Sequence, residues 1–163
     1  MRFELISKMA MTLDVNPAEL STAQEKGVRI IKVGGKYIPT FYKKAGIART
    51  EKMLTDALKK HRHKFWTLEN DGDTAIELRV IYFFPHTSGT PKWKRDHVSF
   101  MTQRPDADNL SKSLLDCMTN LKFWSDDSMV YPFFSKYRSP HPCIRIQMFV
   151  WKQYRDEPGT ITS

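Results

Sequence analysis

Residues 104–127 read RPDADNLSKSLLDCMTNLKFWSDD, and the fold and chemistry expected of this chain depend on them. The stretch holds five of the 18 acidic residues of the protein, and all five are aspartates: Asp106, Asp108, Asp116, Asp126 and Asp127. The whole chain nevertheless carries a formal net charge of +8. Short carboxylates gathered within a basic chain are typical of a hard-cation site that works against a polyanion.

Residues 105–121 predict a helix with two distinct faces. At 100° per residue its apolar side chains fall on one stripe, formed by Leu110, Leu114, Cys117 and Leu121. Asp108, Lys112 and Asp116 advance along the opposite face at intervals of four residues. We therefore expect the helix to bury the apolar stripe and to present an Asp-Lys-Asp ridge outward.

The aspartates at the two ends of this stretch predict a metal site. Asp106 and Asp108 can converge at the start of the helix, whereas a helical rise of about 1.5 Å per residue puts Asp116 roughly 12 Å from Asp108. The third carboxylate would come from Asp126-Asp127, where strand alternation points one of the two at the metal. Three carboxylates with waters favour Mg²⁺, with Mn²⁺ as a substitute.

Such a metal activates a water and neutralises charge on a scissile phosphate. Lys112, one turn after Asp108, is placed to stabilise the transition state or to position the attacking water. The residues therefore predict a phosphodiesterase.

Each piece of this pattern also has a purely structural explanation. Asp106 or Asp108 can cap the helix and complement its dipole. Lys112 and Asp116 can form an exposed ion pair of little energetic value. The pair Asp126-Asp127 can belong to a turn before the next strand.

Other metal-binding and phosphate-binding motifs do not match the sequence. An EF-hand starting at Asp106 would need glycine at Ser111 and glutamate at Cys117. The acidic-x-Lys element of the PD-(D/E)xK nucleases does not follow Pro105-Asp106, and there is neither a glycine-rich phosphate loop nor a set of zinc ligands.

Outward from this stretch, alternating apolar runs predict strands and a hairpin. Strands are expected over 2–7, 75–85, 129–137 and 143–151, and residues 28–42 predict a hairpin that turns at Gly34-Gly35. Residues 47–63 predict an amphipathic helix, and residues 16–27, with Asn16 as a cap and Gly27 at the end, predict a small surface helix. Residues 86–103 read as a loop or β-ribbon, and residues 153–163 as a flexible tail.

The positive charge is concentrated in residues 26–64, which hold 12 Lys and Arg against only Glu51 and Asp56. Basic groups beside Tyr37, Phe41 and Tyr42 suit phosphate contact together with base stacking, although a solvated surface is the simpler account. A second basic cluster, Lys92 to Arg95, carries Trp93, whose alternative role is ordinary packing. The candidate DNA-binding residues are Lys32, Lys36, Lys43, Lys44, Arg49, Lys92, Lys94, Arg95 and Arg104.

Length and composition predict one ordinary globular domain over residues 1–163. Cys117 and Cys143 form no metal-type spacing and suit a reducing compartment. We expect no membrane span and no signal peptide, and hence a cytoplasmic protein.

The motif R-P-D-x-D-N-L-x-K, followed by an Asp four residues later and then by F-W-x-D-D, resembles the RusA family of Holliday-junction resolvases. The matching residues are Arg104, Asp106, Asp108, Asn109, Leu110, Lys112, Asp116, Phe123, Trp124, Asp126 and Asp127. Residues 75–150 match the family pattern closely. The residues before them resemble the family only in the order of their strands and helices.

This resemblance implies a small α+β fold, a mixed sheet carrying two main helices, and a homodimer that cuts four-way DNA junctions symmetrically with Mg²⁺. It also implies a bacterial or phage setting. It implies that Asp106, Asp108 and Asp127 are metal ligands and that Lys112 is the catalytic lysine. Asn109, Asp116 and Asp126 would be supporting residues. Two features depart from the family: residues 9–26 read as extra material, and Lys122 stands where a glycine is expected before Phe123.

Three alternatives to a junction resolvase remain at this level. One is a nuclease of flaps or plain duplex, another is a DNA-binding module whose aspartates are structural, and the last is a basic protein-interaction domain. Their discriminating properties are junction preference, cleavage with a divalent ion, and salt-sensitive DNA affinity.

Overall fold

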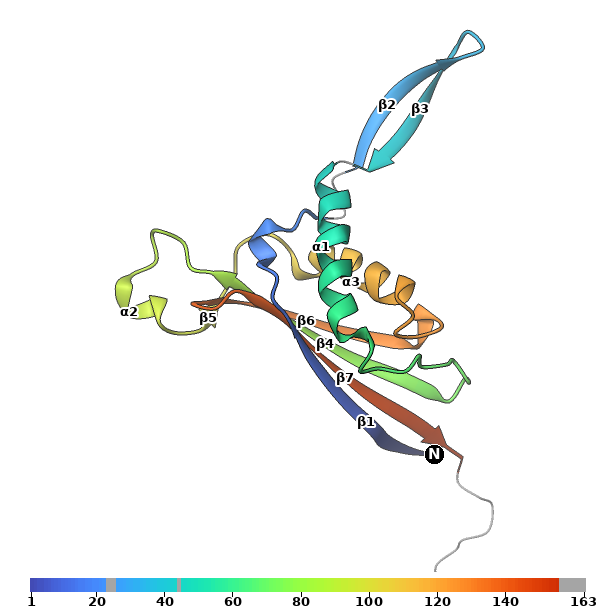
Figure 1. Cartoon of the computed structure of the whole chain (residues 1–163), viewed down its shortest axis with the longest axis vertical. Helices are drawn as coiled ribbons and strands as arrows, with labels where there is room; N and C mark the ends of the chain where they lie inside the picture. Colours follow the sequence, from blue (N-terminus) through green and yellow to red (C-terminus); the bar gives the residue numbers. More distant parts are fainter. Residues whose placement is uncertain (23–25, 44, 156–163) are drawn as a thin grey trace, which may run out of the picture.

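The computed structural model describes residues 1–22, 26–43 and 45–155, without the side chains of 26–27 and 41–43 (Figure 1). A five-stranded sheet has the order β1-β7-β4-β6-β5, and a separate two-stranded sheet pairs β2 with β3. The strands are β1 (Arg2–Leu13), β2 (Lys26–Val33), β3 (Lys36–Lys43), β4 (Thr74–Pro85), β5 (Ser99–Phe100), β6 (Val130–Ser139) and β7 (Cys143–Tyr154). This mixed sheet with its helices confirms the α+β prediction.

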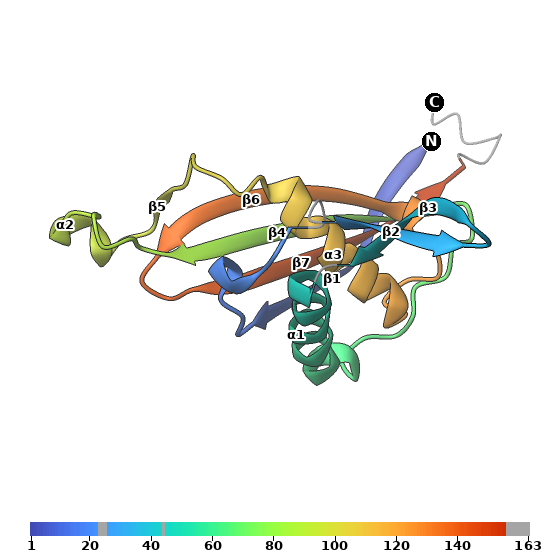
Figure 2. The same ribbon diagram turned by 90° about the horizontal axis from the view of Figure 1, so that it is seen from above.

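Two long helices, α1 (Ala45–Arg62) and α3 (Ala107–Asn120), lie on the same face of the five-stranded sheet (Figures 1 and 2). A single turn, α2 (Lys92–Arg95), lies in the loop between β4 and β5. None of the described helices is long and apolar enough to span a bilayer.

The core lies between the helices and the sheet. Alternate residues of the central strands point into it, among them Ile76, Leu78 and Val80 of β4 and Ile144 and Ile146 of β7, all fully buried. From α3 the predicted stripe of Leu110, Leu114 and Cys117 packs against them, with Leu121 partly buried at its end. The predicted polarity of this helix is therefore confirmed.

β4 and β6 run parallel, and the connection between them contains α3. All other pairs in the described sheets are antiparallel. Parallel neighbours need a long crossover connection, and here that crossover is the aspartate-rich stretch. Asp106 and Asp127 therefore lie in the two segments that enter and leave α3.

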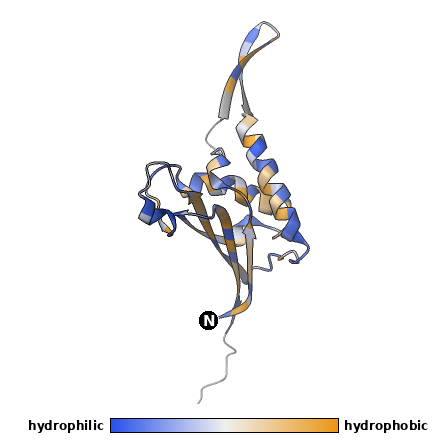
Figure 3. Cartoon of the chain, turned by 60° about the vertical axis from the view of Figure 1, so that its left-hand side comes forward, coloured by the Kyte–Doolittle hydropathy of each residue, from blue (hydrophilic) through white to orange (hydrophobic). Residues whose placement is uncertain are grey.

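The hairpin prediction for residues 28–42 is confirmed, with Gly34 and Gly35 at φ +56° and +82° in the turn. This β2–β3 ribbon, here called the arm, projects away from the five-stranded sheet (Figure 1). Figure 3 shows that polar and apolar residues alternate along it.

The helix expected over 16–27 is wrong. Asn16 does cap a helical turn, accepting a hydrogen bond from the Ala18 amide at 3.0 Å, but only η1 (Pro17–Glu19) forms. Residues 23–25 lie outside the described part, and Gly27, expected to end the helix, pairs with Tyr42 in the arm. Cross-strand pairing therefore prevails over local capping signals.

The structure also changes the predictions for the two ends of the chain: the first strand is longer than predicted, and the last strand extends into the predicted tail. The first strand continues from Ser7 to Leu13, because Met9, Met11 and Leu13 alternate into the helix-covered face against β7. Residues 9–13 are therefore part of the sheet. The predicted tail begins too early, since Gln153 and Tyr154 still belong to β7, and residues 156–163 lie outside the described part.

Candidate active site

The N-terminus of α3 is fixed by groups from two neighbouring strands. Tyr82 of β4 is hydrogen-bonded to Ser111 at 2.8 Å, and the Ser111 hydroxyl donates to the Ala107 carbonyl at 2.7 Å. Burial raises the pKa of Tyr82, so its hydroxyl stays protonated and available as a donor. The first turn of α3 is thereby held on the sheet.

Lys136 of β6 holds the segment that leads into the helix. Its ammonium donates to the carbonyl of Pro105 at 2.8 Å and to the carbonyl of Gln103. Arg138 on the same strand donates to the Pro85 carbonyl at 2.8 Å. The two bonds from Lys136 position Asp106, which is the residue after Pro105.

Asp106 stands at the N-cap position of α3, yet its side chain makes no capping hydrogen bond. Asp108 lies in the first turn, and both carboxylates are exposed. The capping explanation for Asp106 is therefore not what the structure shows. Asp106 shares a cleft of about 450 Å³ with Arg104, Asn109 and Thr22.

Lys112 and Asp116 are both exposed on α3, on the ridge that the sequence predicts. Asp116 lines a second cleft, of about 280 Å³, together with Asp127 and with Glu51 from α1. The supporting role of Asp116 stays a prediction. Its side chain lines the same cleft as Asp127.

The turn after α3 is built by a left-handed residue. Lys122 has φ +59°, and its amide donates to Thr119 while the Phe123 amide donates to Met118. This is the Schellman arrangement, in which glycine is the usual residue at the left-handed position. Glycine is therefore the residue that this backbone favours, and Lys122 departs from it.

Arg62 of α1 braces this turn from the side. Its guanidinium donates to the carbonyls of Leu121 and Lys122, at 2.7 and 2.8 Å, and lies over the Phe123 ring. Phe123 and Trp124 are fully buried, and the Trp124 indole donates to Thr119 at 2.9 Å. The Phe-Trp pair thus anchors the segment that carries Asp126 and Asp127.

The structure distinguishes the two adjacent aspartates. Asp126 caps η2 (Asp127–Met129) by accepting a hydrogen bond from the Ser128 amide at 2.8 Å, which lowers the pKa of Asp126. The structural explanation, in which Asp126 belongs to a turn before the next strand, is therefore correct for this residue. Asp127 is exposed at the start of the turn and faces the cleft that Asp116 lines.

The donor set fits a hard divalent cation in its chemistry, since it consists of exposed carboxylate oxygens. Over residues 1–22, 26–43 and 45–155, however, no three acidic, His or Cys side chains lie close enough together to hold a metal ion. Asp106 and Asp108 flank the start of α3, while Asp127 lies in the cleft with Asp116. The site of three carboxylates therefore stays a prediction. Two of its carboxylates, those of Asp106 and Asp108, lie at the N-terminus of α3.

Six of the nine candidate DNA-binding residues lie in three places. Lys32 and Lys36 are on the arm, with Lys32 over the ring of Tyr37 at 5.6 Å. Lys92, Lys94 and Arg95 are in α2, where Lys94 lies over Trp93. Arg104 is exposed beside Asp106.

Some of these residues have structural partners. Arg95 donates to the carbonyls of Thr90 and Ser88, both at 2.7 Å, so it braces its own loop. Arg49 lies 3.8 Å from Glu19 in an exposed pair. Trp93 is 70% exposed, so the alternative that it is ordinary packing is wrong. The side chain of Lys43 and all of Lys44 lie outside the described part.

Sequence reasoning missed two residues of this region. Lys136 is a lysine at a strand position that faces the helices, opposite Tyr82, and a charge at an inward position was the available signal. Glu51 is one of only two acids within the basic residues 26–64. The other, Asp56, pairs with Lys52 at 2.7 Å, whereas Glu51 lines the cleft of Asp127.

Comparison with known proteins agrees with the motif. Residues 20–149 match the model of the family described as endodeoxyribonuclease RusA, so the match includes the arm and α1 as well as the dense motif. The crossover junction endodeoxyribonuclease rusA of Lactococcus phage r1t is 34% identical over 110 residues, which cover 68% of this chain and 73% of that protein. By both measures, the chain belongs to the RusA endodeoxyribonuclease family.

Proposed function

We propose that this protein is a Mg²⁺-dependent endodeoxyribonuclease that resolves four-way junctions and related branched DNA by cutting opposing strands as a homodimer. The observation that carries the proposal is the N-terminus of α3. There, in a chain of a nuclease family, Asp106 occupies a cap position without capping and is exposed beside Asp108. The phage relative bears the name of a crossover junction endodeoxyribonuclease, which supports the choice of substrate and a phage or prophage setting.

Asp106, Asp108 and Asp127 would hold the metal, with Mn²⁺ as a substitute for Mg²⁺. Mg²⁺ is usually held by one or two protein carboxylates together with waters and substrate phosphates, which suits a site of exposed carboxylates. When bound, the ion neutralises charge on the phosphate and lowers the pKa of a water.

The other residues of α3 act on the phosphate and on the carboxylates. Lys112, one turn beyond Asp108, carries a positive charge to the face where negative charge develops on the phosphate. Asn109 lines the Asp106 cleft, where its amide group would orient that carboxylate, and Asp116 lines the cleft of Asp127 as a supporting residue. Asp126 keeps the turn in shape through its bond to Ser128.

The basic residues hold the DNA backbone on either side of this site. Lys32 and Lys36 of the arm bind phosphates at one end, and Lys92 and Lys94 of α2 bind them at the other. Figure 1 shows the arm and the α2 loop extending from the sheet in different directions, as an extended or branched polyanion requires. Arg104 lies beside Asp106 and contacts the phosphate next to the cut.

The test compares wild type, Asp127→Asn and Asp126→Asn on a labelled four-way junction, a flap and a matching duplex, with Mg²⁺, Mn²⁺ or Ca²⁺. We expect paired cuts near the junction centre with Mg²⁺ or Mn²⁺, lost in Asp127→Asn and retained in Asp126→Asn, because an asparagine oxygen still caps Ser128.

Three outcomes would contradict parts of the proposal. Equal cutting of flap or duplex would remove the junction preference. Junction binding without cutting under any divalent ion would make the protein a branch-binding module. Loss of cutting in both variants would show that Asp126 is as important to the reaction as Asp127.

A further inference from the structure

The arm carries large apolar side chains into solvent. Val28, Ile30, Val33, Tyr37 and Ile38 are between 44% and 72% exposed. The ribbon projects beyond the end of α1 and away from the sheet (Figures 1 and 3), so no second layer of the described chain buries these residues. A two-stranded ribbon is only marginally stable by itself, and exposed apolar residues gathered in this way mark a binding surface.

Both faces of the arm are apolar at mid-length. Strand alternation places Ile30, with Pro39 opposite it on β3, on one face. The next pair, Ile31 with Ile38, lies on the other face. An occupant that lies flat against the ribbon covers one of these pairs and leaves the other in water. The arm therefore fits an occupant that encloses it from two sides.

Cations flank the apolar pairs along the length of the arm. Residues 26–43 hold five Lys and Arg and no acidic residue. Arg29 lies toward the root of the arm, where it joins the rest of the chain, whereas Lys32 and Lys36 lie toward the turn, and all three are exposed. The order of cation, apolar band and cation matches DNA, in which a layer of bases lies between two phosphate backbones.

The apolar pairs need base faces that are not already stacked. In an intact duplex each base pair is covered by its neighbours, and a protein that inserts apolar side chains there has to unstack them at a cost in free energy. At the centre of an opened four-way junction, the last base pair of each duplex has one face that no neighbour covers. A gap between two such base pairs encloses a ribbon from both sides.

The root of the arm lies beside the candidate active site. Thr22, four positions before the arm begins, lines the cleft of Asp106. The amide of Ser21 donates to the hydroxyl of the buried Thr50 at 2.8 Å, so this segment is fixed to α1. At about 3.3 Å per residue, Ile30 lies roughly 13 Å along the arm from its first residue, the length of about four base pairs. An arm inserted at the branch therefore leaves Asp106 within a few nucleotides of it.

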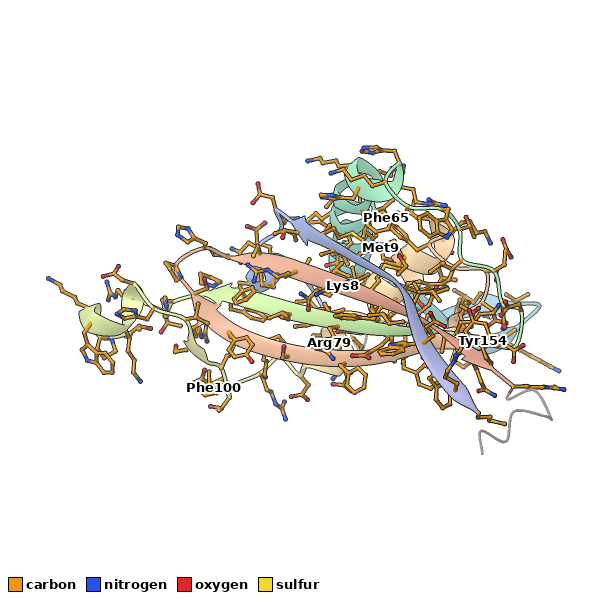
Figure 4. The ribbon with its side chains drawn as sticks, turned by 90° about the horizontal axis from the view of Figure 1, so that it is seen from below. Lys8, Met9, Phe65, Arg79, Phe100 and Tyr154 are labelled. Atoms are coloured by element: carbon orange, nitrogen blue, oxygen red, sulfur yellow. The ribbon has the colours of Figure 1, made fainter. Side chains whose placement is uncertain are left out.

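The uncovered side of the five-stranded sheet is less suited to DNA. Figure 4 views the sheet from this side, where Arg79 and Lys8 lie over the ring of Phe149, at 4.8 and 5.2 Å from its centroid. Arg79 also donates to the carboxylate of Glu77 at 2.6 Å. The cations there are held by the sheet itself, and the carboxylate among them would repel phosphate.

We propose that the arm is inserted at the branch point of its DNA substrate, where its two apolar faces cover the terminal base pairs of two duplexes. Arg29, Lys32 and Lys36 contact the flanking phosphates. This insertion deepens the proposed function and rests on it, because it makes the arm the element that selects branched over continuous DNA. A plain duplex offers the arm phosphates but no open base faces.

The test uses a four-way junction with 2-aminopurine, a base whose fluorescence rises when it is unstacked, in a base pair at the branch point. Ca²⁺ replaces Mg²⁺ so that the DNA is bound and not cut. At saturating protein we expect wild type to raise the fluorescence severalfold over that of the free junction. The double change of Ile30→Thr with Ile38→Thr, here called the isoleucine variant, should lose most of this rise. Threonine removes the apolar end of each side chain and keeps the β-branched shape that suits a strand.

Two matched controls separate insertion from affinity and from folding. Trp66→Thr changes an apolar residue that is 61% exposed in the loop after α1, and it should keep the full rise. Lys32→Ala with Lys36→Ala should weaken binding but keep the rise at saturation, since the apolar pairs remain. Fluorescence anisotropy in the same buffer should show the isoleucine variant losing about tenfold of its preference for junction over duplex, as the loss of two buried methylene groups predicts.

No rise with wild type, an undiminished rise with the isoleucine variant, or an equal loss in Trp66→Thr would overturn the insertion. So would an isoleucine variant that binds all DNA like wild type but no longer binds phosphatidylserine vesicles, since the apolar band would then serve a membrane. Cleavage is measured separately with Mg²⁺: a rise that depends on the two isoleucines without any cutting refutes the nuclease and keeps the insertion. Paired cuts by an enzyme whose isoleucine variant keeps the full rise do the reverse.

Discussion

The ammonium of Lys136 lies 2.8 Å from the carbonyl oxygen of Pro105, and this bond ties β6 to the residue before Asp106. We expect Lys136→Met to slow junction cleavage about ten- to a hundredfold, since a misplacement of about 1 Å at a catalytic group costs that much. Single-turnover kinetics at saturating enzyme measures the effect, and Lys136→Arg should restore part of the rate.

Arg2→Met is the control for Lys136, because Arg2 forms an exposed ion pair with Glu4 on the edge strand β1, which is not a neighbour of β6. Equal loss of rate in both variants would show that Lys136 acts through general stability and not through Asp106.

Removing the Ser111 hydroxyl should lower the free energy of unfolding more than removing the Tyr82 hydroxyl to which it is bonded. Ser111→Ala leaves the buried Tyr82 hydroxyl without its acceptor and should lower the free energy of unfolding by about 1–3 kcal/mol. Tyr82→Phe removes the polar group itself and should cost only about 1 kcal/mol. Urea unfolding at neutral pH measures both, and a larger loss for Tyr82→Phe would contradict this account.

Replacing Lys122 by glycine should stabilise the protein. Its φ of +59° lies in the left-handed region, where glycine is free of the strain that a Cβ introduces. We expect Lys122→Gly to raise the free energy of unfolding by about 0.5–1 kcal/mol, and Lys122→Ala, which keeps the Cβ, to bring no such gain. Thermal and urea unfolding of the two variants side by side decide between a backbone effect and a charge effect.

The pair of Asp71 and Lys152 should make stability depend weakly on pH. The hydrogen bond from Lys152 lowers the pKa of Asp71, so the carboxylate stabilises the fold above its unfolded pKa of about 4, and this is lost as the pH falls further. The pKa of Lys152 is raised, so its contribution is present below about pH 10 and lost above it.

Asp71→Asn should therefore lower the melting temperature slightly between these limits, and the difference from wild type should vanish in strong acid. A difference that persists under strongly acidic conditions would mean that the loop of Asp71 matters for another reason.

Two lysines of the arm should contribute to DNA affinity through phosphate contacts. If Lys32 and Lys36 each neutralise one phosphate, the double change to alanine should reduce the slope of log affinity against log salt by about 1.8. Fluorescence anisotropy on a labelled junction over a range of salt measures the slope. Lys59 and Lys60 of α1, changed together, are the control, and an equal reduction there would indicate a diffuse charge effect.

The sequence predicted best what depends on local periodicity. The ridge of Asp108, Lys112 and Asp116 follows from helix geometry alone, and the turn at Gly34-Gly35 from its residue types. The difference between Asp126 and Asp127 needed the structure, because both are exposed aspartates and only the backbone of η2 shows which one caps it.

The predictions that failed depend on partners far along the chain. Asn16 caps a helical turn as its local sequence indicates, but residues from Lys26 onward pair with β3 instead of continuing a helix. Lys136 stands out only as a charge at an inward strand position, and its role stays hidden in the sequence because its partners, Gln103 and Pro105, lie more than 30 positions away. The exposed rings of Tyr131 and Phe133 on the uncovered side of the sheet could not be placed for the same reason, since strand register alone decides which side they face.

The arm shares no strand with the five-stranded sheet in the described chain. Its residues are therefore released from the register that constrains the rest of the protein, where a shift by one position would turn the core outward. Substitutions and changes of length in β2 and β3 can accumulate without disturbing the scaffold that holds the aspartates. In evolution, substrate preference can thus diverge among relatives while the chemistry stays the same.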